Sequence, residues 1–228
     1  MSYVFPIHEI PVLSVAGTGD VFPVHRIYCV GQNYSEHMYE MGSNHQRDAP
    51  FFFSKPADAV FHQNSQISYP SKTKYLHHEI ELVVAIGEKG SKITKSEAFN
   101  HVFGFTVGMD LTRRDLQHEA KKKGHPWTVA KGFDHSAPCS VLHKVDEVGY
   151  LEKGSITLRV NGEIRQQGDI SEMIWSVPEI ISILSEFFEL CPGDLIFTGT
   201  PSGVGPLKRG DKLEGAVEKL TKLEINIV

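Results

Sequence analysis

Short runs of apolar residues, separated by turn-forming residues, make up most of the chain. Glycine, proline, asparagine and aspartate recur at intervals of about ten residues, a spacing typical of β-rich domains. The strands that this pattern predicts are 26–30, 51–53, 79–86, 102–109, 156–160, 194–197 and 222–227. Asn161 and Gly162 lie between two such runs, and this pair predicts a two-residue hairpin turn.

Capping residues predict a small number of short helices. Ser176 with Glu179 predicts the start of a helix that continues to Phe188, with Pro178 in its first turn. Three further starts are predicted at Asn33 with Glu36, ending near Gly42, at Thr94 with Glu97, and at Thr112, ending at Gly124. Strands and helices do not alternate strictly, so the pattern indicates a mainly β (α+β) fold with short helices rather than a doubly wound sheet.

Length and composition fit a globular domain. The 228 residues are 40% hydrophobic, which is enough apolar material for a sizeable core. No linker-like stretch divides the chain, so we predict one catalytic domain over 1–228, with 1–20 as an N-terminal extension. Cys29, Cys139 and Cys191 lack CxxC spacing, and we expect them to be reduced rather than in disulfides or a zinc site.

The charge pattern narrows the classes of partner. The net charge is −5, with acids and bases spread along the chain, which argues against nucleic-acid binding. No run approaches the roughly 18 apolar residues of a membrane span. The N-terminus lacks the basic and apolar regions of a signal peptide. We therefore expect a cytoplasmic protein that binds neither nucleic acid nor membrane.

Two acids in a predicted strand are the first candidate for chemistry. Glu79 and Glu81 are two residues apart, so they share one face of the strand. Adjacent carboxylates raise each other's pKa unless a positive charge lies between them, and Asp110 follows the next strand. Together the three would form an all-oxygen site suited to Mg²⁺, Mn²⁺ or Ca²⁺. The alternatives are two solvated acids on an exposed strand and a helix N-cap at Asp110.

Three further groups carry candidate side chains. His37 and Glu40 share a helix face, so the carboxylate could orient the imidazole as a general base, although surface pairs with this spacing are common. Arg114 and Gln117 also share a face, which suits carboxylate and carbonyl oxygens or simply a solvated surface. The loop 198–205 is rich in glycine, and it is either a tight turn or a close backbone approach to a carboxylate.

Seven segments in order resemble the fumarylacetoacetate hydrolase family, and specifically its short acylpyruvate and fumarylpyruvate hydrolases. They are VGQNYSEHMYEMG, PFFFSKPADAV, HHEIELVVAIG, GMDLTRRDLQ, KGHPWTVAKGFD, VNGEIRQQGD and PGDLIFTGTPSGVGPLKRGD. The resemblance implies a rolled, mixed β-sheet fold that is usually dimeric. The chain departs from many relatives at Gln32, where they have arginine near the distal end of the substrate.

The resemblance also implies roles for individual residues. Glu79, Glu81 and Asp110 match the ligands of Mg²⁺ or Mn²⁺. The remaining matches are His37 with Glu40 as a water-activating pair on a lid helix, Lys131 beside the metal, Arg114 and Gln117 as substrate contacts, and Thr200 at the substrate carboxylate. The implied reaction is metal-dependent hydrolysis of a carbon–carbon bond in a 2,4-dioxo acid, releasing pyruvate and a carboxylic acid.

Other functions are compatible with the same residues. An oxaloacetate decarboxylase, a tautomerase or a 2-hydroxyhepta-2,4-diene-1,7-dioate isomerase would need the same metal and the same enolate. A metal-stabilised protein without catalytic activity would show a metal effect on its melting temperature and no turnover. An interaction protein without a metal would show neither.

Overall fold

The structure is a computed structural model that describes residues 3–6, 8–34, 49–62 and 65–228. Its largest sheet has the order β4 (Phe51–Lys55), β3 (Ile27–Gly31), β15 (Leu195–Phe197), β8 (Ile80–Ile86), β9 (Val102–Met109), β11 (Ala137–Cys139) and β5 (Val60–His62), with β12 (His143–Lys144) also paired to β9. The pairs β3–β15 and β11–β5 are parallel and the others antiparallel, so the sheet is mixed.

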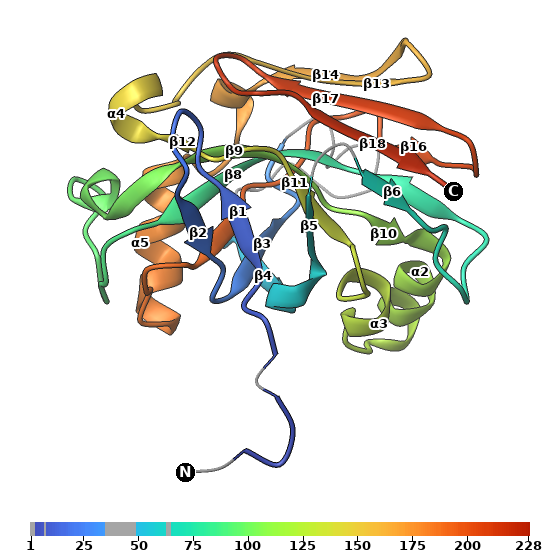
Figure 1. Ribbon diagram of the computed structural model, residues 1–228, viewed down its shortest axis with the longest axis horizontal. Coiled ribbons are helices and arrows are strands. Elements are labelled where there is room, and N and C mark those ends of the chain that lie inside the picture. The colour runs from blue at the N-terminus through green and yellow to red at the C-terminus, as the bar shows by residue number, and fades with distance from the viewer. Residues whose placement is uncertain (1–2, 7, 35–48, 63–64) are drawn as a thin grey trace.

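A second sheet lies over the first (Figure 1). Its order is β14 (Glu163–Asp169), β13 (Ser155–Val160), β17 (Lys212–Val217), β18 (Leu223–Ile227) and β6 (Ser65–Ile67). Two small sheets complete the β structure: β10 (Thr112–Arg113), β7 (Leu76–His78) and β16 (Gly205–Pro206) in one, and β1 (Val12–Ser14) with β2 (Val21–Pro23) in the other. The predicted fold, mainly β in rolled, mixed sheets, is confirmed.

The helices among the described residues are short. The α-helices are α2 (Arg114–Lys123), α3 (Thr128–Lys131), α4 (Val145–Val148) and α5 (Val177–Phe187), and the 3-10 helices are η1 (Ala57–Ala59), η2 (Ala98–His101) and η3 (Ile170–Glu172). None of the described helices is long and apolar enough to cross a membrane.

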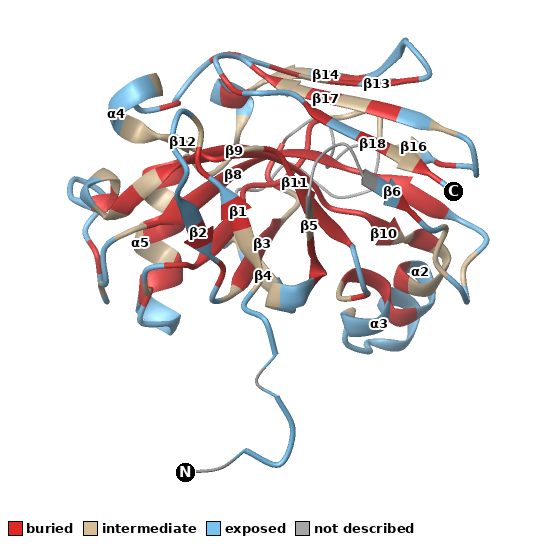
Figure 2. Cartoon of the chain, viewed as in Figure 1, coloured by how far each residue is buried: buried red, intermediate tan, exposed pale blue. Residues whose placement is uncertain are grey.

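The core forms on both faces of the central strand β8. Leu82 and Val84 pack toward the second sheet in a cluster that includes Leu158, whereas Val83 packs on the other face in a cluster with Leu13. Burial is concentrated along β8 and β9 (Figure 2). A strand covered on both faces is expected to be almost continuously apolar, and Glu81 is the exception in β8.

Several predicted local features are confirmed. Asn161 and Gly162 have φ angles of 53° and 85° and join β13 to β14, as a two-residue hairpin requires. At the start of α5, the Glu179 carboxylate accepts hydrogen bonds from the Ser176 N–H at 3.0 Å and the Ser176 hydroxyl at 2.8 Å. The three cysteines are free thiols, as expected.

The helix starts predicted at Thr112 and Thr94 were wrong. Thr112 belongs to β10 and its hydroxyl donates to the Asp110 carbonyl oxygen at 3.2 Å, so it does not cap α2. The Thr94 hydroxyl donates to Glu97 at 2.7 Å, but only the 3-10 turn η2 follows. Asn33 uses its side-chain oxygen to accept from the Trp175 N–H at 2.7 Å; the helix predicted after it lies outside the described residues.

The predicted strand 79–86 is confirmed as β8, apart from Glu79, which lies between β8 and the preceding strand β7. β7 belongs to the small sheet with β10 and β16, while β8 begins at Ile80 in the largest sheet. Glu79 is therefore the point at which the chain passes from one sheet to the other, and its side chain lies at the junction between them.

Candidate active site

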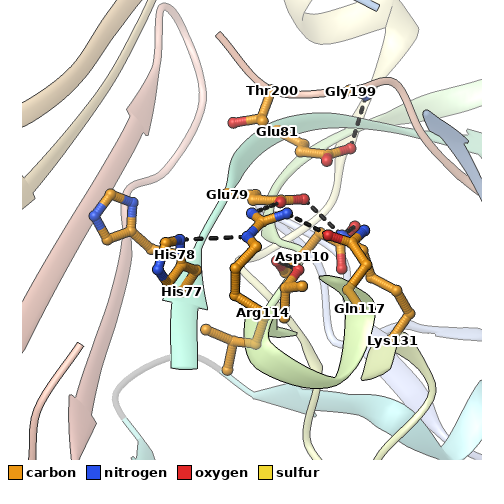
Figure 3. A network of polar contacts seen from close by, with 12 residues as sticks. His77, His78, Glu79, Glu81, Asp110, Arg114, Gln117, Lys131, Gly199 and Thr200 are labelled. Carbon is orange, nitrogen blue, oxygen red and sulfur yellow. Dashed lines mark hydrogen bonds and ion pairs between the residues drawn. The ribbon is translucent and has the colours of Figure 1, made fainter. Parts of the chain in front are cut away.

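One pocket contains every predicted site residue that the structure describes. Its lining includes the acids Glu79, Glu81 and Asp110 together with Arg114, Gln117, Lys131 and Thr200. The predicted pair His37 and Glu40 lies outside the described residues. The described candidate residues therefore line a single pocket. Figure 3 shows their side chains close together: Glu79, Glu81 and Asp110 in or beside strands, Arg114 and Gln117 on α2, Lys131 at the end of α3 and Thr200 in a loop.

The three acids are brought together by the register of β8 and β9. Ile80 pairs with Met109 in this antiparallel ladder, and the Asp110 N–H donates to the Glu79 carbonyl oxygen at 2.8 Å, so Asp110 stands opposite Glu79. One oxygen from each of the three side chains lies within 4.8 Å of the others. All three residues are at most 5% exposed, so solvated acids on an open strand face are ruled out.

Three buried cations face these carboxylates. The Lys131 ammonium lies 2.7 Å from Glu79 Oε2 and 2.7 Å from Asp110 Oδ2, and so bridges the two acids (Figure 3). Burial would lower the pKa of Lys131, but the Asp110 and Glu79 carboxylates raise it, which keeps the ammonium charged. Arg114 pairs with Glu79 through Nη2, and Lys55 pairs with Asp110 Oδ1 at 2.8 Å.

Glu81 differs from its two neighbours in its partners. The only hydrogen bond to its carboxylate within the described part of the chain comes from the Gly199 N–H at 2.7 Å. Burial raises the pKa of Glu81 well above its usual range, and the charges of Asp110 and Glu79 raise it further. A cation placed among the three carboxylates would remove this penalty. The donor set is all oxygen and carboxylate-rich, which fits Mg²⁺ or Mn²⁺ better than zinc.

Lys55 is a residue of this site that the sequence analysis missed. Besides its pair with Asp110, its ammonium donates to the carbonyl oxygens of Leu111 at 3.2 Å, Ser136 at 3.0 Å and Lys131. It thereby fixes the backbone at the end of α3, from which the Lys131 side chain reaches the acids. A lysine at the end of an aromatic strand, directly before proline, was the available signal, since a lysine that is buried needs a partner.

Arg114 and Gln117 are buried rather than on a solvated helix face. They are 2% and 3% exposed, and Arg114 Nη1 donates to Gln117 Oε1 at 2.6 Å. Arg114 Nε also donates to His77 Nδ1 at 3.4 Å. These bonds, with the pair to Glu79, hold both side chains in place at the pocket wall, where Gln117 presents its amide.

The glycine-rich loop approaches the site with its backbone. Gly199 has φ +96°, and a Cβ atom at this position would lie 2.7 Å from the Cβ of Asn33. Glycine is therefore required here for the N–H to reach Glu81. The aromatic residues Phe51, Phe53 and Trp127 also line the pocket.

Comparisons with known proteins agree with this architecture. The chain matches the family described as fumarylacetoacetate (FAA) hydrolase C-terminal over residues 26–228. A mitochondrial oxaloacetate tautomerase of Homo sapiens is 41% identical over 201 residues, covering 88% of this chain and 90% of that protein. A fumarylpyruvate hydrolase of Ralstonia sp is 39% identical over 177 residues, covering 78% of this chain and 92% of that protein.

Among solved structures, fumarylpyruvate hydrolase from Pseudomonas aeruginosa in complex with Mn²⁺ and pyruvate superimposes with a TM-score of 0.97. It is 46% identical, and the match covers 100% of this chain and 99% of that one. The family match extends from the third strand to the end of the chain and includes all three acids and the lysine that bridges two of them. This protein belongs to the fumarylacetoacetate hydrolase C-terminal family.

Proposed function

We propose that the protein is a metal-dependent hydrolase of a 2,4-dioxo acid of the fumarylpyruvate or acylpyruvate type, releasing pyruvate and a carboxylic acid. The observation that carries the proposal is the buried triad of Glu79, Glu81 and Asp110, with oxygens within 4.8 Å of one another. The similarity to the Ralstonia and Pseudomonas fumarylpyruvate hydrolases supports it. Like its hydrolase family, the protein is an enzyme.

The charge of the site supports an anionic substrate. Lys55, Lys131 and Arg114 offset the three carboxylates, so the buried groups described are close to neutral together. A divalent ion held by the three acids would leave the pocket positive, and Lys121 at its wall adds to this. A substrate with two carboxylates, such as fumarylpyruvate, would compensate this positive charge better than a substrate with one, because a buried charge needs a compensating partner.

The chain's residues have distinct roles in the proposed reaction. Bound Mg²⁺ or Mn²⁺ would supply positive charge that stabilises an enolate. His37, oriented by Glu40, deprotonates a water whose oxygen attacks the C4 carbonyl. Lys131 and Gln117 stabilise the resulting oxyanion. The C3–C4 bond then breaks, its electron pair passes to C3 as the enolate of pyruvate, and protonated His37 returns to C3 the proton that it took from the water.

Described residues on both sides of the segment that carries His37 line the pocket. Gln32 precedes it and Phe51 follows it, and both contribute to the pocket wall. This supports a role for the His37 and Glu40 pair at the same site. We also propose that the protein is a homodimer, as the family resemblance implies.

Tautomerisation or decarboxylation of oxaloacetate is the second candidate function. It is favoured by the 41% identity to the human oxaloacetate tautomerase. Both reactions use the same enolate, but neither needs a water to attack carbon. An isomerase of 2-hydroxyhepta-2,4-diene-1,7-dioate would also need the three acids to bind the metal.

Parallel assays distinguish these functions. We would measure pyruvate release from fumarylpyruvate and acetylpyruvate with Mn²⁺ or Mg²⁺ and again with EDTA. Oxaloacetate would be assayed for enol loss and for pyruvate release. Metal-dependent cleavage of a dioxo acid, with slower conversion of oxaloacetate, is the expected result. Conversion of oxaloacetate alone would overturn the hydrolase proposal in favour of the second candidate.

A further inference from the structure

Behind the pocket, the Thr200 hydroxyl is held by a fully buried glutamine. Gln166 lies on β14 and is 0% exposed. Its amide nitrogen lies 2.8 Å from Thr200 Oγ1 and 2.8 Å from the Pro201 carbonyl oxygen. Its amide oxygen lies 3.1 Å from the Ile80 nitrogen and 2.9 Å from His78 Nδ1. The amide oxygen and the amide nitrogen of Gln166 therefore have two partners each.

The direction of each of these hydrogen bonds is fixed by the backbone. The Ile80 N–H can only donate and the Pro201 carbonyl can only accept, so the Gln166 oxygen must face Ile80 and its nitrogen must face Pro201. His78 Nδ1 must then carry a hydrogen, because it faces the same oxygen. At the other end, Thr200 Oγ1 must accept from the Gln166 NH₂ group.

A hydroxyl that accepts at its oxygen still has its own hydrogen to donate. No acceptor for the Thr200 hydroxyl hydrogen is found among the residues that the structure describes, and Thr200 lines the pocket beside Glu81 (Figure 3). We infer that Gln166 is a positioning residue that holds the Thr200 hydroxyl as a hydrogen-bond donor to a substrate carboxylate. This rests on the proposed function, because it requires an anionic ligand in the pocket.

The inference explains why an uncharged amide is buried at this place. A carboxylate at 166 would accept from Thr200, turn its hydroxyl away from the pocket and oppose the Pro201 carbonyl. An apolar residue would leave the hydroxyl free to rotate. Only a side chain with a donor at one end and an acceptor at the other fits both backbone partners and fixes the hydroxyl.

A double-mutant cycle tests the inference without turnover. The measurement is the Kd of pyruvate, the expected product, by calorimetry in the presence of saturating Mn²⁺. Thr200→Val should weaken binding about 10-fold or more, as for a lost hydrogen bond to a charged group. Gln166→Met should weaken binding several-fold when Thr200 is present and by less than about 2-fold when Val replaces it.

Matched variants separate positioning from a general structural effect. Thr200→Ser keeps the hydroxyl and should bind pyruvate like the wild type while staying sensitive to Gln166→Met. Gln167→Met, at the exposed neighbouring position, should change nothing. The Mn²⁺ affinity should be the same in all variants. If Gln166→Met does not fold, Gln166→Glu, which keeps the oxygen facing Ile80, takes its place in the cycle.

Additive effects of the two substitutions, or equal pyruvate binding by Gln166→Met and the wild type, would overturn the inference. So would wild-type protein that binds Mn²⁺ but not pyruvate, because the hydroxyl would then have no carboxylate to meet. If only the proposed function is wrong, the result is different: the pyruvate Kd still shows coupling between Gln166 and Thr200, but no dioxo acid is cleaved.

Discussion

Lys131→Met should destabilise the metal-free protein and make it more responsive to metal. The Lys131 ammonium lies 2.7 Å from both Glu79 and Asp110, and all three side chains are buried. Removing one partner of a buried ion pair costs about 3–5 kcal/mol. Arg114 still pairs with Glu79 and Lys55 with Asp110, so we expect a loss at the lower end, about 3 kcal/mol.

That loss can be measured as a melting temperature. For a chain of this length, 1 kcal/mol corresponds to about 2–4 °C, so the variant should melt about 6–12 °C below the wild type in EDTA. Because a divalent ion can neutralise the two carboxylates that the lysine leaves, saturating Mn²⁺ should raise the melting temperature more in Lys131→Met than in the wild type.

A variant of an exposed lysine serves as the control for Lys131→Met. Lys122→Met alters an exposed lysine near the end of α2 and should change stability by less than about 0.5 kcal/mol. A melting temperature of Lys131→Met in EDTA within about 2 °C of the wild type would contradict the buried bridge. An equal metal-induced rise in both proteins would show that Lys131 and the ion do not share the same carboxylates.

Three further results are expected. Glu81→Gln should abolish the metal-induced rise in melting temperature without lowering stability in EDTA, since it removes a buried carboxylate whose pKa is raised; the exposed Glu186→Gln should retain the rise, and a rise in both would remove Glu81 from the metal site. His37→Ala should lower kcat by about 10²–10⁴-fold with unchanged Mn²⁺ affinity, and an unchanged kcat would exclude it as the base. Burial, assisted by the charge of Arg114, lowers the pKa of His77 to about 3, so the folded protein resists protonation that the unfolded chain accepts near pH 6.5. Stability should therefore fall as the pH decreases from about 6.5 toward 3, and His77→Asn should make that slope shallower by up to about 1.4 kcal/mol per pH unit; an identical slope would refute the assignment.

Local sequence signals predicted the elements whose ends they control. Asn161 and Gly162 determine a turn because their backbone angles suit few other residues. Ser176 and Glu179 determine a helix start because both partners lie within one turn. Where the side chain of a predicted cap bonds another group, as Thr112 does with the Asp110 carbonyl oxygen, the local pattern placed the helix start wrongly.

The chemistry of the candidate site was also present in the sequence, as two acids two residues apart and a third after the next strand. The three acids lie close together only because β8 pairs with β9, which places Asp110 opposite Glu79. The change of sheet at Glu79 was not predicted from the sequence, because it depends on which distant strands pair with β7 and with β8.

The sequence by itself therefore determined the residue types, the strand periodicity and the turns, which depend on neighbours within a few residues. Tertiary structure alone decided which acids share a cation, how Lys55 and Lys131 are buried, and how Gln166 reaches Thr200. These contacts join positions 21 to 81 residues apart, and nothing in the intervening chain encodes their distance or direction. They follow from strand pairing and packing across sheets, and so appear only when the whole fold is formed.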